Sequence, residues 1–193
     1  MSKVYQVKIA IKDIKPEIWR RIIVPESITF YKFHKIIQAA FGWQDYHLFN
    51  FDFKDTIVEI PDFEYSPGEL YGENLKVLNA KRIKIDELLS ERKNCTYTYD
   101  FGDNWEHEVI LEKEFEAEKG VKYPLCIQGA RNRPPEDVGG IGGYESFIQI
   151  IGDENNPEQE ENLIWAEKDT NGRKFDPEYF YLREVNKALL KIK

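Results

Sequence analysis

The segment 97–107, which reads YTYDFGDNWEH, is the strongest constraint on the fold. Aromatic and β-branched residues alternate with polar ones on both sides of a Gly-Asp-Asn turn signal, and this pattern predicts a β-hairpin. A hairpin rich in Tyr, Phe and Trp is equally typical of plain core packing, because buried aromatic faces dominate the energetics of a sheet. The hairpin is therefore a candidate functional surface and a candidate core element.

Two pairing registers are compatible with this turn, and each gives a different polar cluster. With a three-residue loop, 102–104, Asp100 faces Glu106, and two opposed carboxylates require a nearby Lys, Arg or metal ion. With a two-residue loop, 103–104, Asp100 faces His107, and a carboxylate beside an imidazole suits a general base or a metal ligand. The sequence leaves both registers open.

Hydrophobic periodicity predicts an α+β fold. Period-two alternation predicts three further strands, at residues 5–11, 18–24 and 47–53. A helical period marks residues 30–41, and the last third contains three helix candidates, at 144–151, 156–168 and 176–191. The last two open on Asn-Pro and Asp-Pro pairs, which suit a helix N-terminus. We expect one domain over residues 1–193, with a mostly antiparallel sheet, helices packed on it and a helical C-terminal third.

A long polar and glycine-rich loop, residues 129–144, precedes those helices. Loops of this length in a compact domain are usually functional or disordered. Its adjacent prolines and the four glycines within 139–143 suggest a defined path with close backbone approaches. The glycines before a helix resemble a phosphate cradle, but no Lys-Ser/Thr follows them, and Glu136, Asp137 and Glu145 make the loop acidic. Phosphate binding is therefore disfavoured.

The net charge of −8 at pH 7 disfavours a general binder of nucleic-acid backbones. A local nucleic-acid surface stays open through a set of cationic and stacking side chains: Arg20, Arg21, Arg131, Arg133, Trp19 and Trp105. Cys95 and Cys126 match no zinc-site spacing. The chain carries no secretory pattern at its N-terminus and no apolar run as long as a membrane span, so we expect a cytoplasmic protein without membrane association.

A metal site is the sharper chemical hypothesis. Five candidate ligands lie on or beside the hairpin, Asp100, Asp103, Glu106, His107 and Glu108, and Glu136 and Asp137 lie in a loop that could fold over it. Oxygen ligands with a single imidazole suit Mg²⁺ or Mn²⁺ better than zinc. The competing interpretation is a structural ion-pair network, in which the same carboxylates are neutralised by an arginine: Arg20, Arg131 or Arg133.

Four segments resemble a known family. They are WRR at 19–21, FGW at 41–43, the hairpin at 99–107 and GARNRPPEDVGGIGGY at 129–144. In this order they resemble the plasmid pRiA-4b ORF-three-like family, whose members are also met as passenger proteins of insertion elements. The resemblance gives no activity that can be transferred to this chain, and it leaves the cofactor unknown. It directs attention to residues of the two central motifs: Asp100, Asp103, Trp105, His107, Arg131, Pro135, Glu136, Asp137, Gly139, Gly140 and Tyr144.

Two functions follow as hypotheses. The leading one is a non-catalytic binding or accessory protein of mobile elements, which uses the 99–107 hairpin and the 129–144 loop as one recognition surface. The alternative is a metal-dependent hydrolase or nuclease-like enzyme whose ion is held by five residues: Asp100, Asp103, His107, Glu136 and Asp137. An enzyme requires at least three of these side chains near one point, whereas a binding module can spread them over a surface.

Overall fold

The computed structural model describes residues 2–61, 75–170 and 172–192. Its strands are β1 (Lys3–Ile11), β2 (Trp19–Pro25), β3 (Phe49–Asp52), β4 (Thr56–Glu59), β5 (Lys76–Asn79), β6 (Asn94–Tyr99), β7 (Trp105–Glu116) and β8 (Leu125–Ala130). The helices of the described part are α1 (Phe30–Phe41), α3 (Asp86–Arg92), α4 (Gly140–Gly152), α5 (Gln159–Asp169) and α6 (Leu182–Leu189). The predicted α+β fold, with a mostly antiparallel sheet and a helical C-terminal third, is confirmed.

The eight strands form one sheet in the order β5-β4-β3-β6-β7-β1-β2-β8. Neighbouring strands run antiparallel, apart from β4 and β5, which pair in parallel. Alternation along each strand gives the sheet two different faces: in β1, for example, Val7 and Ile9 are fully buried whereas Gln6 and Lys8 are half-buried. One face is thus the floor of the core, and the other is polar.

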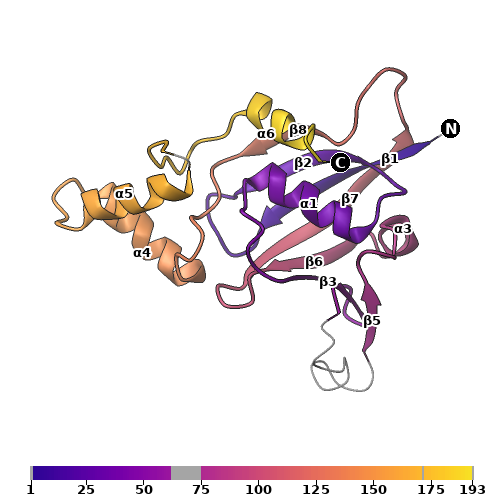
Figure 1. Ribbon diagram of the computed structural model, residues 1–193, viewed down its shortest axis with the longest axis horizontal. Coiled ribbons are helices and arrows are strands. Elements are labelled where there is room, and N and C mark those ends of the chain that lie inside the picture. Colours follow the sequence, from indigo (N-terminus) through magenta and orange to yellow (C-terminus); the bar gives the residue numbers. More distant parts are fainter. Residues whose placement is uncertain (1, 62–74, 171, 193) are drawn as a thin grey trace.

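Helix α1 lies across the core face of the sheet (Figure 1). Its N-terminus is capped by Thr29, whose side chain accepts a hydrogen bond from the Lys32 N–H at 3.2 Å. Phe30, Phe33 and Ile37 are fully buried along one stripe of the helix. The helix ends at Gly42, which adopts a left-handed φ of 85° and donates its N–H to the Gln38 carbonyl. This turn directs the chain towards the end of the sheet where the candidate site lies.

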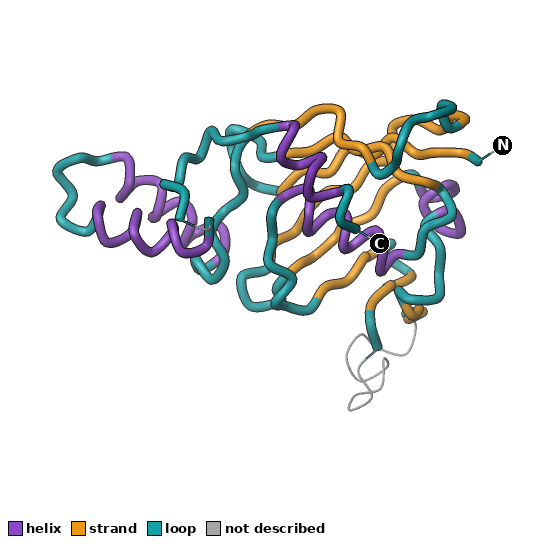
Figure 2. Tube along the Cα trace, turned by 45° about the horizontal axis from the view of Figure 1, so that its top comes forward, coloured by secondary structure: helices purple, strands orange, loops and turns teal. Residues whose placement is uncertain are grey.

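The helices of the C-terminal third lie in two separate places. Helix α6 contacts α1 and β8, while α4 and α5 contact each other and project beyond the end of the sheet (Figures 1 and 2). No helix of the described residues is both long enough and apolar enough to cross a membrane.

The predicted helix starts at 156 and 176 are wrong by several residues. Helix α5 begins at Gln159 and α6 only at Leu182. The Asn156 and Asp176 side chains each accept a hydrogen bond from the N–H two residues later, at 2.9 Å, and so close a local turn instead of capping the helix.

Candidate functional site

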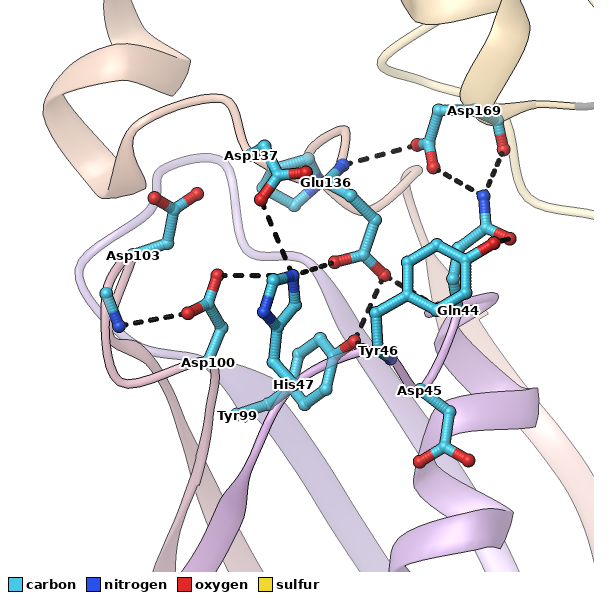
Figure 3. Close-up of polar contacts among 12 residues, drawn as sticks. Gln44, Asp45, Tyr46, His47, Tyr99, Asp100, Asp103, Glu136, Asp137 and Asp169 are labelled. Atoms are coloured by element: carbon cyan, nitrogen blue, oxygen red, sulfur yellow. Dashed lines mark hydrogen bonds and ion pairs between the residues drawn. The ribbon is translucent and has the colours of Figure 1, made fainter.

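Three loops meet at one end of the sheet (Figure 3): 42–48 after α1, 100–104 between β6 and β7, and 131–139 between β8 and α4. The Asp100 N–H donates to the Leu48 carbonyl at 2.9 Å, which joins the first two loops. The Gln44 N–H donates to Glu136 Oε1 at 2.7 Å, and the Gly139 N–H donates to Asp103 Oδ2 at 3.1 Å. The 99–107 hairpin and the 129–144 loop, both predicted to form the site, therefore lie side by side. The 42–48 loop, which the sequence analysis did not select, lies beside them.

The hairpin adopts neither of the two expected registers. Tyr99 pairs with Trp105 and Tyr97 with His107, so that the turn is the five-residue loop 100–104. Left-handed backbone at Asp100 and Asn104, with φ of 58° and 54°, makes the wider turn possible. It is closed by a hydrogen bond from the Asn104 N–H to the Asp100 carbonyl at 2.7 Å. Asp100 consequently faces neither Glu106 nor His107 across the hairpin.

The register buries two of the predicted site residues. Trp105 and His107 are both fully buried among the core aromatic rings. His107 Nδ1 lies 2.9 Å from the Trp105 carbonyl, and its Nε2 accepts the indole N–H of Trp43 at 3.3 Å. Burial lowers the pKa of His107 to about 4, so the ring is neutral at physiological pH. The structure places both residues in the core and not among the carboxylates.

His47 supplies the imidazole of this site (Figure 3). Its Nε2 lies 3.7 Å from Asp100 Oδ2, 3.5 Å from Asp137 Oδ1 and 3.9 Å from Glu136 Oε2. All three distances exceed a hydrogen bond. The candidate ligand atoms of His47, Asp100 and Asp137 lie within 4.8 Å of one another. Three predicted residues, Asp100, Glu136 and Asp137, therefore converge on a histidine that the sequence analysis did not select.

Two buried polar atoms at this point have no hydrogen-bond partner among the described residues: His47 Nε2 and Glu136 Oε2. The other oxygen of Glu136 is well supported, since it accepts from the Gln44 N–H and from the Tyr99 hydroxyl at 3.3 Å. Burial raises the pKa of Glu136, an effect that the Gln44 N–H and Arg133 partly offset. Leaving such atoms unpaired is costly, and a cation between them would satisfy both.

The arginines do not form the ion-pair network considered above. Arg131 donates to Glu178 at 2.6 Å, and Arg133 donates to Asp169 at 2.6 Å. Arg20 donates to backbone carbonyls. In the described part of the chain, no arginine forms an ion pair with Asp100, Glu136 or Asp137. Of the nucleic-acid surface considered above, Arg20, Arg131, Arg133 and Trp105 are buried, whereas Arg21 and Trp19 are half-buried.

The remaining predicted residues divide into two groups. Asp103, Gly139 and Gly140 make the contact between the hairpin loop and the start of α4. Arg131 and Tyr144 instead line a separate depression of about 390 Å³ that also includes Lys15. Ten of the eleven motif residues, all except Pro135, thus occupy three places: the carboxylate cluster with its supporting contact, this depression, and the core.

Asp169, at the C-terminal end of α5, links two of the three loops. Its carboxylate accepts two hydrogen bonds from Arg133, at 2.6 and 3.0 Å, and one from the Gln44 side chain at 2.9 Å. The Glu136 N–H also points to it, at 3.4 Å. No local sequence pattern could reveal this role, because Asp169 lies far along the chain from both loops.

The family profile described as "Plasmid pRiA4b ORF-3-like protein" matches residues 3–184, nearly the whole chain. The chain belongs to this family. A relative of this plasmid pRiA4b ORF-3-like chain, uncharacterized protein y4hQ of Sinorhizobium fredii, is 32% identical to it over 166 residues, which cover 86% of this chain and 82% of that protein.

A solved structure is also similar to the chain. It is the crystal structure of a protein of unknown function, MM3350 from Methanosarcina mazei Go1, with 38% identity and a TM-score of 0.81. The similarity covers 96% of this chain and 97% of that one, so the two share the fold over essentially their full length.

Proposed function

We propose that the loops 42–48, 100–104 and 131–139 bind a divalent metal ion, and that the protein is a metal-dependent hydrolase. The observation that carries the proposal is the convergence of ligand atoms around His47, two of which are buried and have no hydrogen-bond partner among the described residues. Ligands that share an ion at about 2.1–2.2 Å lie roughly 3–4 Å from one another. The separations of 3.5–3.9 Å around His47 Nε2 are compatible with an ion held between these groups.

Mn²⁺ is the ion that the donor set favours. Carboxylates suit Mg²⁺, Ca²⁺ and Mn²⁺, whereas an imidazole suits transition metals. A site with His47 beside Asp100 and Asp137 combines both donor types. Mn²⁺ accepts both, so we expect it to bind more tightly than Mg²⁺ or Ca²⁺.

Access from solvent supports a catalytic role over a structural one. The Asp137 side chain is 73% exposed and that of His47 is 28% exposed, so water can reach the site. Three protein ligands leave coordination positions open for water and substrate, as in catalytic metal sites. Glu136 directs its unpaired oxygen towards His47, where it can complete the ligand set or accept a proton from a water molecule.

Metal binding is tested by titrating metal-stripped full chain with Mn²⁺, Mg²⁺, Ca²⁺ and Zn²⁺, using calorimetry and thermal unfolding. We expect one Mn²⁺ per chain, and a rise in stability of about 2.7 kcal/mol at a hundredfold excess over Kd. His47→Ala and Asp137→Ala should abolish binding. Glu108→Gln, which changes an exposed carboxylate on β7, should not. Absence of Mn²⁺ binding in folded protein would refute the site.

Hydrolysis is tested separately, with phosphomonoester, phosphodiester, carboxylic ester and amide substrates in the presence of Mn²⁺. Turnover that needs Mn²⁺ and disappears in His47→Ala would support the enzyme. Binding of Mn²⁺ without turnover of any class would favour the second candidate, a non-catalytic recognition module. The hydrogen bond between Gly139 and Asp103 supports that candidate, because it joins the hairpin loop and the 129–144 loop into one surface.

The cellular setting is part of the proposal. The family description names a plasmid, which supports an association with mobile elements.

A further inference from the structure

A cavity of about 440 Å³ opens between the C-terminal end of α1, residues 169–170 and 173–181, and helix α6. Its volume lies in the range of small-molecule sites. The four residues that surround the proposed metal, His47, Asp100, Glu136 and Asp137, are not part of its wall. The cavity therefore requires an explanation of its own.

Positive charge predominates on the wall of this cavity. Four cationic side chains line it, Arg20, Arg133, Arg173 and Lys191, against only two carboxylates, Asp169 and Glu184. Arg133 and Asp169 neutralise each other through two hydrogen bonds. In a chain with a net charge of −8, such a local excess of cations favours an anionic occupant.

Arg20 is the buried member of this set, with an exposed fraction of 3%. Its guanidinium lies between the rings of Phe41 and Phe180, with centroid distances of 4.8 and 4.7 Å. Its nitrogens donate to four backbone carbonyls, and no carboxylate of the described residues forms an ion pair with it. Burial lowers its pKa to about 10, so it stays charged at neutral pH. Buried charges are usually paired, and this one lacks an anionic partner.

Arg173 and Lys191 are also incompletely neutralised. The Nε of Arg173 is buried and has no hydrogen-bond partner among the described residues. Its Nη1 lies 3.8 Å from Glu184, whose carboxylate already accepts the Tyr179 hydroxyl at 2.5 Å. Lys191 forms no ion pair within the part of the chain that the structure describes. Arg173, which also stacks on the Tyr179 ring with its Cζ 3.5 Å from the centroid, keeps one unsatisfied donor, and Lys191 keeps an ammonium without an ion pair among the described residues. Both groups can therefore contact an anion in the cavity.

We propose that this cavity binds a small organic anion, whose charged group contacts Arg173 and Lys191 in the field of Arg20. The apolar body of the ligand packs against rings that line the same cavity: Phe41, Phe175 and Phe180. A carboxylate and a phosphate share the chemistry that an arginine recognises, so either can be the charged group.

The test is calorimetric titration of the full chain with benzoate, phenyl phosphate, inorganic phosphate and, as a neutral analogue, benzyl alcohol. We expect saturable binding of benzoate or phenyl phosphate, at least about tenfold tighter than that of benzyl alcohol, and weaker in high salt. The stronger of the two aromatic anions identifies the charged group. Inorganic phosphate should bind more weakly than phenyl phosphate, because it lacks the apolar body.

Arg173→Gln should weaken binding of the better anion by about tenfold. Arg183→Gln, an exposed arginine on α6 outside the cavity, is the matched control and should leave it unchanged. If Arg173→Gln fails to fold, Lys191→Gln provides the same measurement at the rim. Equal binding of benzyl alcohol, equal loss in Arg183→Gln, or no binding of either aromatic anion to folded protein would overturn the proposal.

Discussion

Replacing Gly140 by alanine perturbs the contact between the two central segments without touching a proposed ligand. Gly140 begins α4 and packs directly on the hairpin loop. A Cβ placed there would lie 2.6 Å from the Asp103 carbonyl oxygen, and the residue has a φ of +66°. The substitution therefore introduces both a collision with a backbone atom and a strained backbone conformation.

The expected cost follows from these two effects. A non-glycine residue in left-handed backbone costs about 1–2 kcal/mol. Forcing the neighbouring backbone to move costs about 1–3 kcal/mol, the usual range for overpacking. The free energy of unfolding should therefore fall by roughly 2–5 kcal/mol, which for a domain of this size lowers Tm by roughly 5–15 °C.

The matched control is Gly142→Ala in the same helical turn, where an added Cβ meets no atom within 4 Å. That change should be neutral or stabilise by up to about 1 kcal/mol, because alanine favours the helix. Thermal unfolding of metal-free protein measures both. Gly140→Ala should in addition weaken Mn²⁺ binding, because it moves Asp137 away from Asp100. Equal Tm values for the two variants would refute the close contact.

Three further predictions concern residues around the site. Asp169→Asn should weaken Mn²⁺ binding by about tenfold, because it loosens both ligand loops, whereas Asp153→Asn should not; equal affinities in calorimetry would contradict this. Because burial raises the pKa of Glu136, its contribution to stability is complete below the unfolded pKa and is lost as the pH rises through the folded pKa. Glu136→Gln should flatten that loss in metal-free unfolding curves, and Glu108→Gln should preserve it. His107→Ala should lower the unfolding free energy by roughly 3 kcal/mol. Any protein that stays folded should still bind one Mn²⁺, and loss of binding in such a protein would argue against the core role of His107.

Apolar periodicity predicted the elements that depend on burial. Strands β1 and β2 and helix α1 follow the alternation and the helical stripe of the sequence, because side chains such as Ile9 and Phe33 must leave water. The hairpin register escaped prediction because it depends on left-handed backbone at Asp100 and Asn104, which no alternation pattern can reveal. The parallel pairing of β4 with β5 depends likewise on contacts distant in sequence.

The carboxylates of the site could be predicted from the sequence, whereas its histidine, His47, could not. Asp100, Glu136 and Asp137 stood out as acidic residues in turn-rich segments. His47 alternates with Phe49 and Phe51, which made it resemble one more core-facing residue of a strand. In the structure β3 begins only at Phe49, so His47 extends past the strand end towards the two acidic loops.

Asp100 and Asp137 share an unusual backbone: both adopt positive φ, 58° and 56°. Glycine adopts positive φ without this strain, so a glycine at either position should make the fold more stable than the aspartate does. Selection for stability alone would therefore remove the carboxylates of the cluster, first from one loop and then from the other. A laboratory evolution experiment that selected only for heat resistance should therefore replace these two aspartates early, and the resulting proteins should have a higher Tm and lack the proposed Mn²⁺ site.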